Sequence, residues 1–170
     1  MDYNDGMNYA AIIAGLGAFL FVLVAISLVF YLLQAYGVYK MAQKRGIPNA
    51  GLAFVPIVQC LTIGALLGET ELFGKRFKAG LALLIGAIAV TFLSSVPVLG
   101  IILDIAFFVL YYIILYRIYL LYKSESAVLY TILSVIFSGI ATPIIFFSLR
   151  NTEIYAATFN EYTEKNPFEN

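Results

Sequence analysis

Three polar side chains inside apolar segments are the first candidates for chemistry. Asp104 is the only acidic residue within a long apolar run, and Gln59 and Thr62 share one face of a short uncharged segment that follows Pro56. Polar groups within apolar spans are costly and often mark ion or proton pathways. We therefore expect a polar cavity or ion site at Asp104, Gln59 and Thr62. The alternatives are stabilisation of Asp104 by the positive end of its helix, and hydrogen bonding of Gln59 and Thr62 to a neighbouring helix.

Aromatic and basic residues around position 115 form a second group of candidates. Tyr112, Tyr116 and Tyr119 are spaced by four and three residues, which places them on one face of a helix. Arg117 lies near the end of the same apolar run, where a long cationic side chain can extend to anionic headgroups. Tyrosine rings favour the interface between hydrocarbon and water. We expect these four residues to contact lipids or headgroups. Core hydrogen bonds or a hydroxyl-lined ligand groove are the alternatives for the tyrosines.

Most catalytic groups are missing from the sequence. The chain has no His and one Cys, which removes imidazole-activated nucleophiles, histidine metal ligands and an intrachain disulfide. An aspartyl dyad would need two carboxylates in apolar segments, and only Asp104 qualifies. Glu69 and Glu71 stand beside basic residues and indicate a solvated charged loop. We therefore expect no enzymatic activity, no metal and no cofactor.

The composition indicates which solvent surrounds the chain. Of 170 residues, 62% are hydrophobic and 12% are charged, and the mean hydropathy is +0.94. Soluble domains carry about 25% charged residues, and one small core cannot bury such an apolar excess. Ten acidic and ten basic residues leave no net charge, which argues against a nucleic-acid partner. The composition predicts an all-α integral membrane protein.

The apolar runs predict four transmembrane helices and one half-helix. A helix needs about 20 apolar residues to cross about 30 Å of hydrocarbon. The runs predicted to cross, with a kink at Pro143 in the last, cover about 9–37, 79–94, 97–121 and 127–149. Residues 51–68 are interrupted by Pro56, which leaves a helix of only about 18 Å. This segment is predicted to be re-entrant or partly buried, in a single bundle over 9–149 between polar tails at 1–8 and 150–170.

Basic residues decide between two topologies. If residues 51–68 re-enter, eight of the ten Lys and Arg residues fall on one side, whereas a spanning segment divides them five and five. Cytoplasmic loops collect Lys and Arg. We therefore expect a cell-membrane protein with the re-entrant arrangement and with both termini outside.

Two repeated patterns concern packing and turns. Small residues recur at positions 11, 18 and 25 and at 79, 82, 86 and 89, which favours close helix approach, either within the bundle or across a homodimer face. The runs Val55-Pro56-Ile57-Val58 and Val96-Pro97-Val98-Leu99 both place Val-Pro before two aliphatic residues. We interpret both prolines as first-turn residues of helices. The alternative is an internal repeat that marks two halves of a transporter.

One stretch of the chain carries a family resemblance. It contains a basic cluster from Lys40, then Gly46-x-Pro48-Asn49-Ala50, then Leu52-Ala53-Phe54-Val55-Pro56-Ile57, and it closes at Gly68. With these features it resembles a class of small bacterial multi-pass membrane proteins of uncharacterised function, although Gly51 stands where that class often has tryptophan. The resemblance covers about thirty residues. It implies a bacterial inner membrane and nothing about activity.

The missing catalytic groups and the small-residue stripes together lead to a functional hypothesis. The sequence predicts a non-catalytic scaffold or accessory subunit of a membrane complex, surrounded by membrane lipids and bound to a membrane-protein partner or to a second copy. A small transporter or channel, with its cavity at Asp104, Gln59 and Thr62, is the alternative, because broken helices often mark substrate sites.

Overall fold

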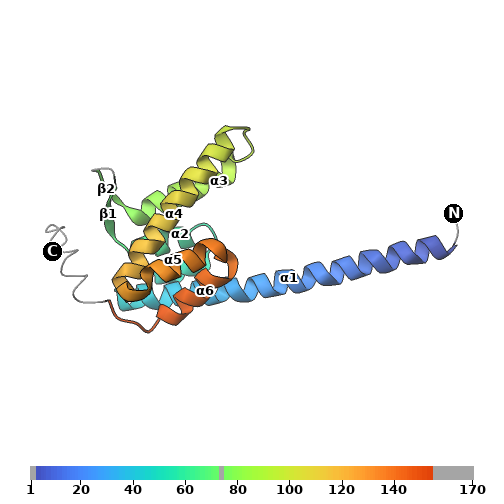
Figure 1. Ribbon diagram of the computed structural model, residues 1–170, viewed down its shortest axis with the longest axis horizontal. Coiled ribbons are helices and arrows are strands. Elements are labelled where there is room, and N and C mark those ends of the chain that lie inside the picture. Colours follow the sequence, from blue (N-terminus) through green and yellow to red (C-terminus); the bar gives the residue numbers. More distant parts are fainter. Residues whose placement is uncertain (1–2, 73–74, 155–170) are drawn as a thin grey trace.

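The computed structural model of the protein describes residues 3–72 and 75–154. Its helices are α1 (Tyr3–Lys44), α2 (Gln59–Ala65), α3 (Ala79–Leu93), α4 (Leu99–Lys123), α5 (Ala127–Ile136) and α6 (Ser138–Leu149) (Figure 1). Two 3₁₀ segments, Ala50–Phe54 and Ser124–Ser126, and two strands, β1 (Glu69–Leu72) and β2 (Lys75–Lys78), complete the regular structure of these residues. The prediction of a mainly helical chain is confirmed, and the pair of strands was not predicted.

The predicted tails fall partly outside the described residues. Helix α1 already begins at Tyr3, so most of the predicted N-terminal tail at 1–8 is helical. The predicted C-terminal tail at 150–170 is described only as far as residue 154.

Helix α1 is the longest element and ends at a glycine signal. Its 42 residues extend about 63 Å, and in Figure 1 the blue N-terminal part runs far from the other helices. At its C-terminal end Gly46 has a φ of 65°, the Gly46 amide donates to the Gln43 carbonyl oxygen at 3.0 Å, and the Ile47 amide donates to the Ala42 carbonyl oxygen at 3.0 Å. This is the Schellman arrangement, which glycine favours because it lacks a Cβ, and Pro48 then prevents further helix.

Within residues 3–72 and 75–154, two helical stretches, rather than the four predicted, are long and apolar enough to cross a membrane: Tyr9–Lys44 and Leu99–Ile136. Helix α3, in the predicted span 79–94, has only 15 residues, about 22 Å of helix. The predicted span 127–149 is divided in two at Phe137, whose φ of −120° and ψ of 46° lie outside the helical region. The Ser138-Gly139 pair that follows is a common site of helix breaks. The predicted kink residue, Pro143, lies inside α6.

The break at Phe137 reverses the direction of the chain, so that α6 returns toward the Lys44 end, where α5 begins. Along α5, Tyr130 packs on Tyr119 of α4 with ring centroids 5.8 Å apart, and Ser134 meets Tyr112 seven residues earlier in α4, so α4 and α5 are antiparallel. Helix α6 then runs parallel to α1, because Phe147 packs on Tyr36 at 6.1 Å and the Lys44 ammonium donates to the Asn151 carbonyl oxygen at 2.7 Å.

The course of α6 bears on the predicted topology. Residues 150–170 were predicted on the side opposite Lys44, together with the N-terminus. Because Asn151 contacts Lys44, the start of this tail lies at the Lys44 end of α1, and the N-terminus lies at the other end (Figure 1). The start of the tail and the first turns of α1 therefore lie at opposite ends of α1, which does not support the prediction that both termini share one side. This arrangement arises because residues 127–149 fold into a helical hairpin instead of one continuous helix.

The segment between α1 and β1 also forms a hairpin. It starts at the Lys44 end of the molecule and returns to that end. The Tyr31 hydroxyl in α1 donates to the Phe54 carbonyl oxygen at 2.7 Å, so Phe54 lies about 13 residues back along α1 from Lys44. The chain then returns through α2 to Thr70, which accepts a hydrogen bond from Arg117 near the end of α4. Helix α2 itself, Gln59–Ala65, is shorter than the predicted 51–68.

Both Val-Pro repeats form the same turn. The Val58 amide donates to the Pro56 carbonyl oxygen at 2.6 Å, and the Leu99 amide donates to the Pro97 carbonyl oxygen at 2.7 Å. The residues between them, Ile57 and Val98, have φ values of 64° and 66°. These are γ-turns, which reverse the chain just before a helix. The prolines therefore precede α2 and α4 and do not occupy their first turns.

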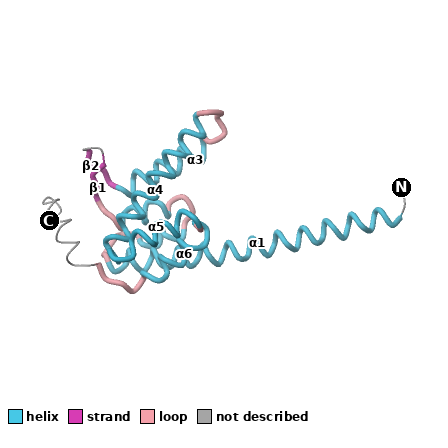
Figure 2. The backbone as a smooth tube through the Cα atoms, in the orientation of Figure 1, coloured by secondary structure: helices cyan, strands magenta, loops and turns pink. Residues whose placement is uncertain are grey.

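The strands form an antiparallel hairpin in the predicted charged loop (Figure 2, magenta). Its register places Glu69 opposite Lys78 and Glu71 opposite Arg76, so unlike charges face each other across the ladder. Opposite charges on facing strands stabilise such pairs. Thr70 is 4% exposed because α4 covers it through Arg117.

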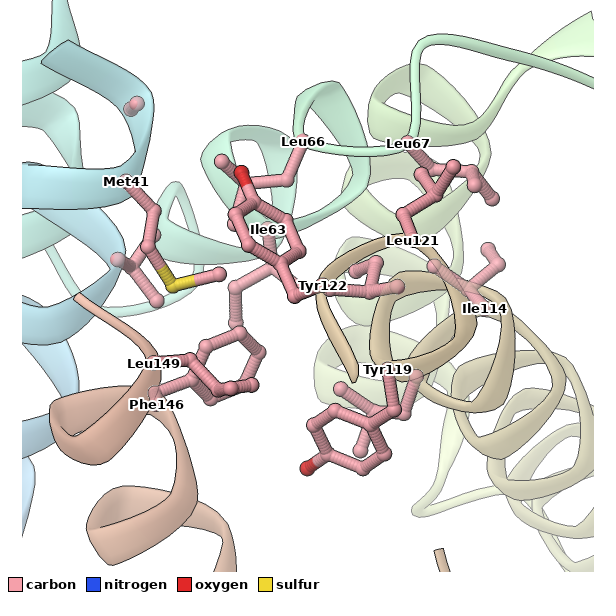
Figure 3. Packing of buried hydrophobic residues seen from close by; sticks show 14 of the residues in the cluster. Met41, Ile63, Leu66, Leu67, Ile114, Tyr119, Leu121, Tyr122, Phe146 and Leu149 are labelled. Atoms are coloured by element: carbon pink, nitrogen blue, oxygen red, sulfur yellow. The ribbon is translucent and has the colours of Figure 1, made fainter. Parts of the chain in front are cut away.

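The hydrophobic core lies at the Lys44 end, between the last turns of α1, α4 and α6 and the segment around α2. Figure 3 shows the side chains that converge there: Met41 of α1, Ile63 of α2 and Leu66 just after it, Tyr119 and Tyr122 of α4, and Phe146 and Leu149 of α6. Two parts of the chain away from this core are uncovered. Every residue from Tyr9 to Val29 is exposed, as is the turn between α3 and α4 from residue 91 to 99.

Candidate functional site

Tyr112 and Tyr119 form a buried hydroxyl cluster with Ser134. The Tyr112 hydroxyl donates to the Ser134 carbonyl oxygen at 2.9 Å, and the Tyr119 hydroxyl lies 2.9 Å from Ser134 Oγ. Ser134 and Tyr119 are both 0% exposed, and Tyr112 is 8% exposed. Because a buried hydroxyl must find a partner, this cluster joins α4 to α5. For these two tyrosines the structure supports core hydrogen bonding, which the sequence left as an alternative.

The other two predicted headgroup residues have different surroundings. Tyr116 is 36% exposed and lies at the edge of the face that carries the buried tyrosines. Arg117 donates from Nη1 to Thr70 Oγ1, which attaches the charged hairpin to α4. The geometry therefore gives Arg117 a structural partner within the chain.

Gln59 and Thr62 lie inside the core, at the start and middle of α2. Gln59 is 7% exposed and Thr62 is 4% exposed. Gln59 Nε2 is buried and has no hydrogen-bond partner among the described residues. Their spacing of three residues places Gln59 and Thr62 on one face of α2, as predicted. This face packs on the neighbouring elements, so both side chains are buried.

Asp104 is in a different environment from Gln59 and Thr62. It lies in the second turn of α4, near the end of the α3–α4 hairpin, and its side chain is exposed. Because Asp104 is exposed while Gln59 and Thr62 are buried, the structure does not assemble these three residues into one cavity. Asp104 lies beyond the first turn of α4, so the alternative of stabilisation by the positive end of its helix has little support, because that effect falls off within the first turn.

A cavity at the Lys44 end is lined by residues that were not predicted from the sequence to form a site. Its lining consists of Lys44, Arg45, Tyr122, Thr152, Glu153 and Ile154, and its volume is about 380 Å³. We call it the Arg45 cavity. Its walls come from the ends of α1 and α4 and from the residues after α6. The only signal for this cavity in the sequence is the basic pair Lys44 and Arg45 at the end of a long apolar segment. The other lining residues could not be predicted, because the sequence does not show that the residues after α6 lie beside this pair.

A second hollow, with a volume of about 460 Å³, opens where α1 separates from α6. Apolar side chains dominate its lining, with polar groups from Ser27, Tyr31 and Gln34 of α1, facing Gly139, Ile140 and Pro143 of α6. We call it the α1–α6 groove. It borders the start of the uncovered part of α1.

The small residues of α3 are used within the chain. A Cβ added at Gly86 would meet Phe107 of α4 at 2.6 Å, and one added at Gly64 of α2 would meet the backbone of Ala79 and Gly80 at 2.5 Å. These glycines permit close helix approach. In α1, by contrast, a Cβ added at Gly15 or Gly17 would meet nothing within 4 Å.

The chain matches no family of proteins, no curated protein and no solved structure in comparisons of sequence and fold. The function is therefore argued from the geometry of the chain.

Proposed function

We propose that this protein is a non-catalytic integral membrane protein that acts as a scaffold or accessory subunit, and that the uncovered part of α1 binds a transmembrane helix of a partner membrane protein. One observation carries the proposal. The most apolar 18-residue window of α1 has a mean hydropathy of 2.8 and is 0% buried. Exposed apolar surface of this extent requires lipid or another protein to cover it.

The charge distribution supports a membrane around the apolar parts. Nine of the ten basic residues belong to segments that meet at the Lys44 end: Lys40, Lys44, Arg45, Lys75, Arg76, Lys78, Arg117, Lys123 and Arg150. Such clustering is typical of the cytoplasmic side. With the resemblance of residues 40–68, we propose a bacterial inner membrane, crossed by α1, α3 and α4, with 46–68 and 127–149 as two re-entrant hairpins. Helix α3, about 22 Å long, would cross where the bilayer is locally thinned. The N-terminus would then be outside and residue 151 inside.

Glycine in α1 supports a protein partner in addition to lipid. Glycine within a helix costs about 1 kcal/mol relative to alanine. At Gly37, Gly64, Gly80 and Gly86 this cost is accompanied by a close contact with a neighbouring segment. Gly15 makes no such contact, although Ala11 and Ala18 flank it on the same helical face. A helix that crosses α1 at this face would use the space that these small residues leave.

The transporter or channel hypothesis has less support. It required Asp104, Gln59 and Thr62 to line a common cavity, and Asp104 is exposed while the other two are buried. Neither the Arg45 cavity nor the α1–α6 groove includes any of the three.

The proposal is tested by recovering a tagged copy from the membranes of its natural host in a mild detergent. We expect a second membrane protein to be recovered in a fixed ratio. Gly15→Leu, which fills the small-residue face, should abolish the recovery. Gly17→Leu is the matched control, because it lies about 200° around the same helix and also contacts nothing.

Three results would overturn the proposal. The first is a wild-type protein that is recovered alone as a monomer. The second is recovery with only a second copy of itself, which would make α1 a homodimer face. The third is equal partner retention by Gly15→Leu and Gly17→Leu, since no face of α1 would then be specific.

A further inference from the structure

The Arg45 cavity contains hydrogen-bond donors that lack acceptors. Arg45 Nη1 and the Tyr122 hydroxyl are both buried, and neither has a hydrogen-bond partner among the described residues. The Tyr122 side chain is only 4% exposed, and both residues line the same cavity. Leaving a buried donor without an acceptor is costly, and more so for a charged group. Two such groups at one cavity indicate an acceptor that binds there.

The charges that line the cavity favour an anionic acceptor. Lys44 and Arg45 contribute two positive charges, and Glu153 contributes one negative charge from an exposed position. The Lys44 ammonium already donates to the Asn151 carbonyl oxygen. The Arg45 guanidinium therefore provides the available charge, and its planar set of donors matches two oxygens of a phosphate or carboxylate.

Helix termini alone do not explain the position of Arg45. The C-terminal ends of α1, α4 and α6 meet near the cavity, and their partial negative charges favour cations. This accounts for Lys44, whose ammonium contacts a carbonyl oxygen just after α6. It does not account for Arg45 Nη1, which contacts none of these carbonyl oxygens.

We propose that the Arg45 cavity binds a phosphate group, held by Arg45 Nη1 and the Tyr122 hydroxyl. The volume of about 380 Å³ lies within the range of about 300–1,000 Å³ of small-ligand sites. It far exceeds the roughly 30 Å³ of a single water. The Tyr122 ring and Ile154 supply an apolar wall beside the donors.

Two sources provide this chemistry, a phospholipid headgroup and a soluble phosphate ester. The lipid source rests on the proposed function, because it needs the Lys44 end to lie at the headgroup level of a membrane. The soluble source does not depend on the membrane placement.

Calorimetric titration of the purified full chain in a neutral detergent tests the proposal. Three probes are used. Dioctanoyl phosphatidylglycerol carries both acyl chains and a phosphate, glycerol phosphate carries only the phosphate, and dioctanoyl glycerol carries only the acyl chains. We expect binding of at least one phosphate-containing probe and none of dioctanoyl glycerol. Binding of the lipid alone identifies a headgroup site, and comparable binding of glycerol phosphate identifies a soluble ester. Both results support a phosphate site.

Variants connect the binding to the named atoms. Arg45→Gln and Tyr122→Phe should each raise the Kd about tenfold or more, because each removes a donor to a charged group. Glu153→Gln should lower the Kd by removing a like charge. Arg76→Gln is the matched control, since it removes an exposed arginine of β2 outside the cavity and should leave the Kd unchanged.

Stability without ligand provides an independent check. Tyr122→Phe should not lower the Tm of the ligand-free protein, because its hydroxyl has no partner to lose. A lower Tm would show that another part of the chain already satisfies this hydroxyl, and would overturn the proposal. Binding of dioctanoyl glycerol as tight as that of the phosphate probes, no binding at all, or equal effects of Arg45→Gln and Arg76→Gln would also overturn it. None of these results bears on the binding of a partner by α1.

Discussion

At the scale of single residues, the buried hydroxyls of Tyr112 and Tyr119 join α4 to α5 through hydrogen bonds to Ser134, which the sequence left as one alternative. The spacing of Tyr112 and Tyr119 placed them correctly on one helical face. Their partner, Ser134, is 15 residues beyond Tyr119, and no local pattern indicates that it lies opposite both. Asp104 was equally visible in the sequence, but its exposure depends on how the α3–α4 hairpin extends from the core. Residue type identified the candidates, and the fold decided which of them meet.

Replacing Ser134 tests the importance of this hydroxyl cluster. Ser134→Ala removes the partner of the Tyr119 hydroxyl, which is 0% exposed and would remain buried without a hydrogen bond. We expect a loss of about 1–3 kcal/mol in the free energy of unfolding. Denaturant titration in detergent, followed by circular dichroism, measures it. Ser27→Ala is the control, since that exposed hydroxyl bonds only to its own helix, at Leu23. Equal stability of both variants would contradict the role of the cluster.

At the scale of elements, the ends of helices were more predictable than their continuity. Gly46 and Pro48 mark the end of α1 in the sequence, and the Schellman hydrogen bonds form there. The division of 127–149 was not foreseen, because Pro143 is the stronger local signal and the break occurs at Phe137 instead. Packing decides this case. The shorter α6 lies against α1 with its backbone directly on Gly37, a contact that one continuous helix would not make.

The crossing of α1 and α6 gives a prediction for Gly37. A Cβ at this position would lie 2.6 Å from the backbone carbon and oxygen of Phe146, so Gly37→Ala must push the helices apart. We expect it to lower the free energy of unfolding by about 1–3 kcal/mol. Gly17→Ala, in an uncovered part of the same helix, should be neutral or stabilise by up to about 1 kcal/mol. Thermal unfolding of both variants distinguishes them. A Gly37→Ala protein as stable as the control would contradict the close crossing.

At the scale of the whole molecule, the two hairpins collect the basic residues at one end. The sequence count assigned eight of the ten to one side, and the return of α6 adds Arg150. The core lies at the same end, while α1 and the α3–α4 turn extend away from it (Figure 1). The molecule therefore has one polar, packed end and two apolar extensions.

Cysteine accessibility in native membranes tests this polarity. In a Cys60→Ser background, Lys75→Cys and Glu153→Cys should react with an impermeant reagent from one side. Tyr9→Cys and Ser95→Cys should react from the other side, because they lie at the ends of the two extensions. If Glu153→Cys reacted from the same side as Tyr9→Cys, residues 127–149 would cross the membrane instead of forming the hairpin of α5 and α6. That result would support the arrangement predicted from the sequence, with both termini outside.

The sequence by itself determined the properties that depend on local composition. The apolar excess, the helical character, the end of α1 at Gly46 and the interruption near Pro56 all follow from residue types and short spacings. Only the tertiary structure decided the direction of α6, the burial of Gln59 and Thr62 apart from Asp104, and the meeting of Arg45 with Tyr122. These depend on contacts between residues far apart in the chain, where close packing selects one arrangement among several that the local signals allow equally.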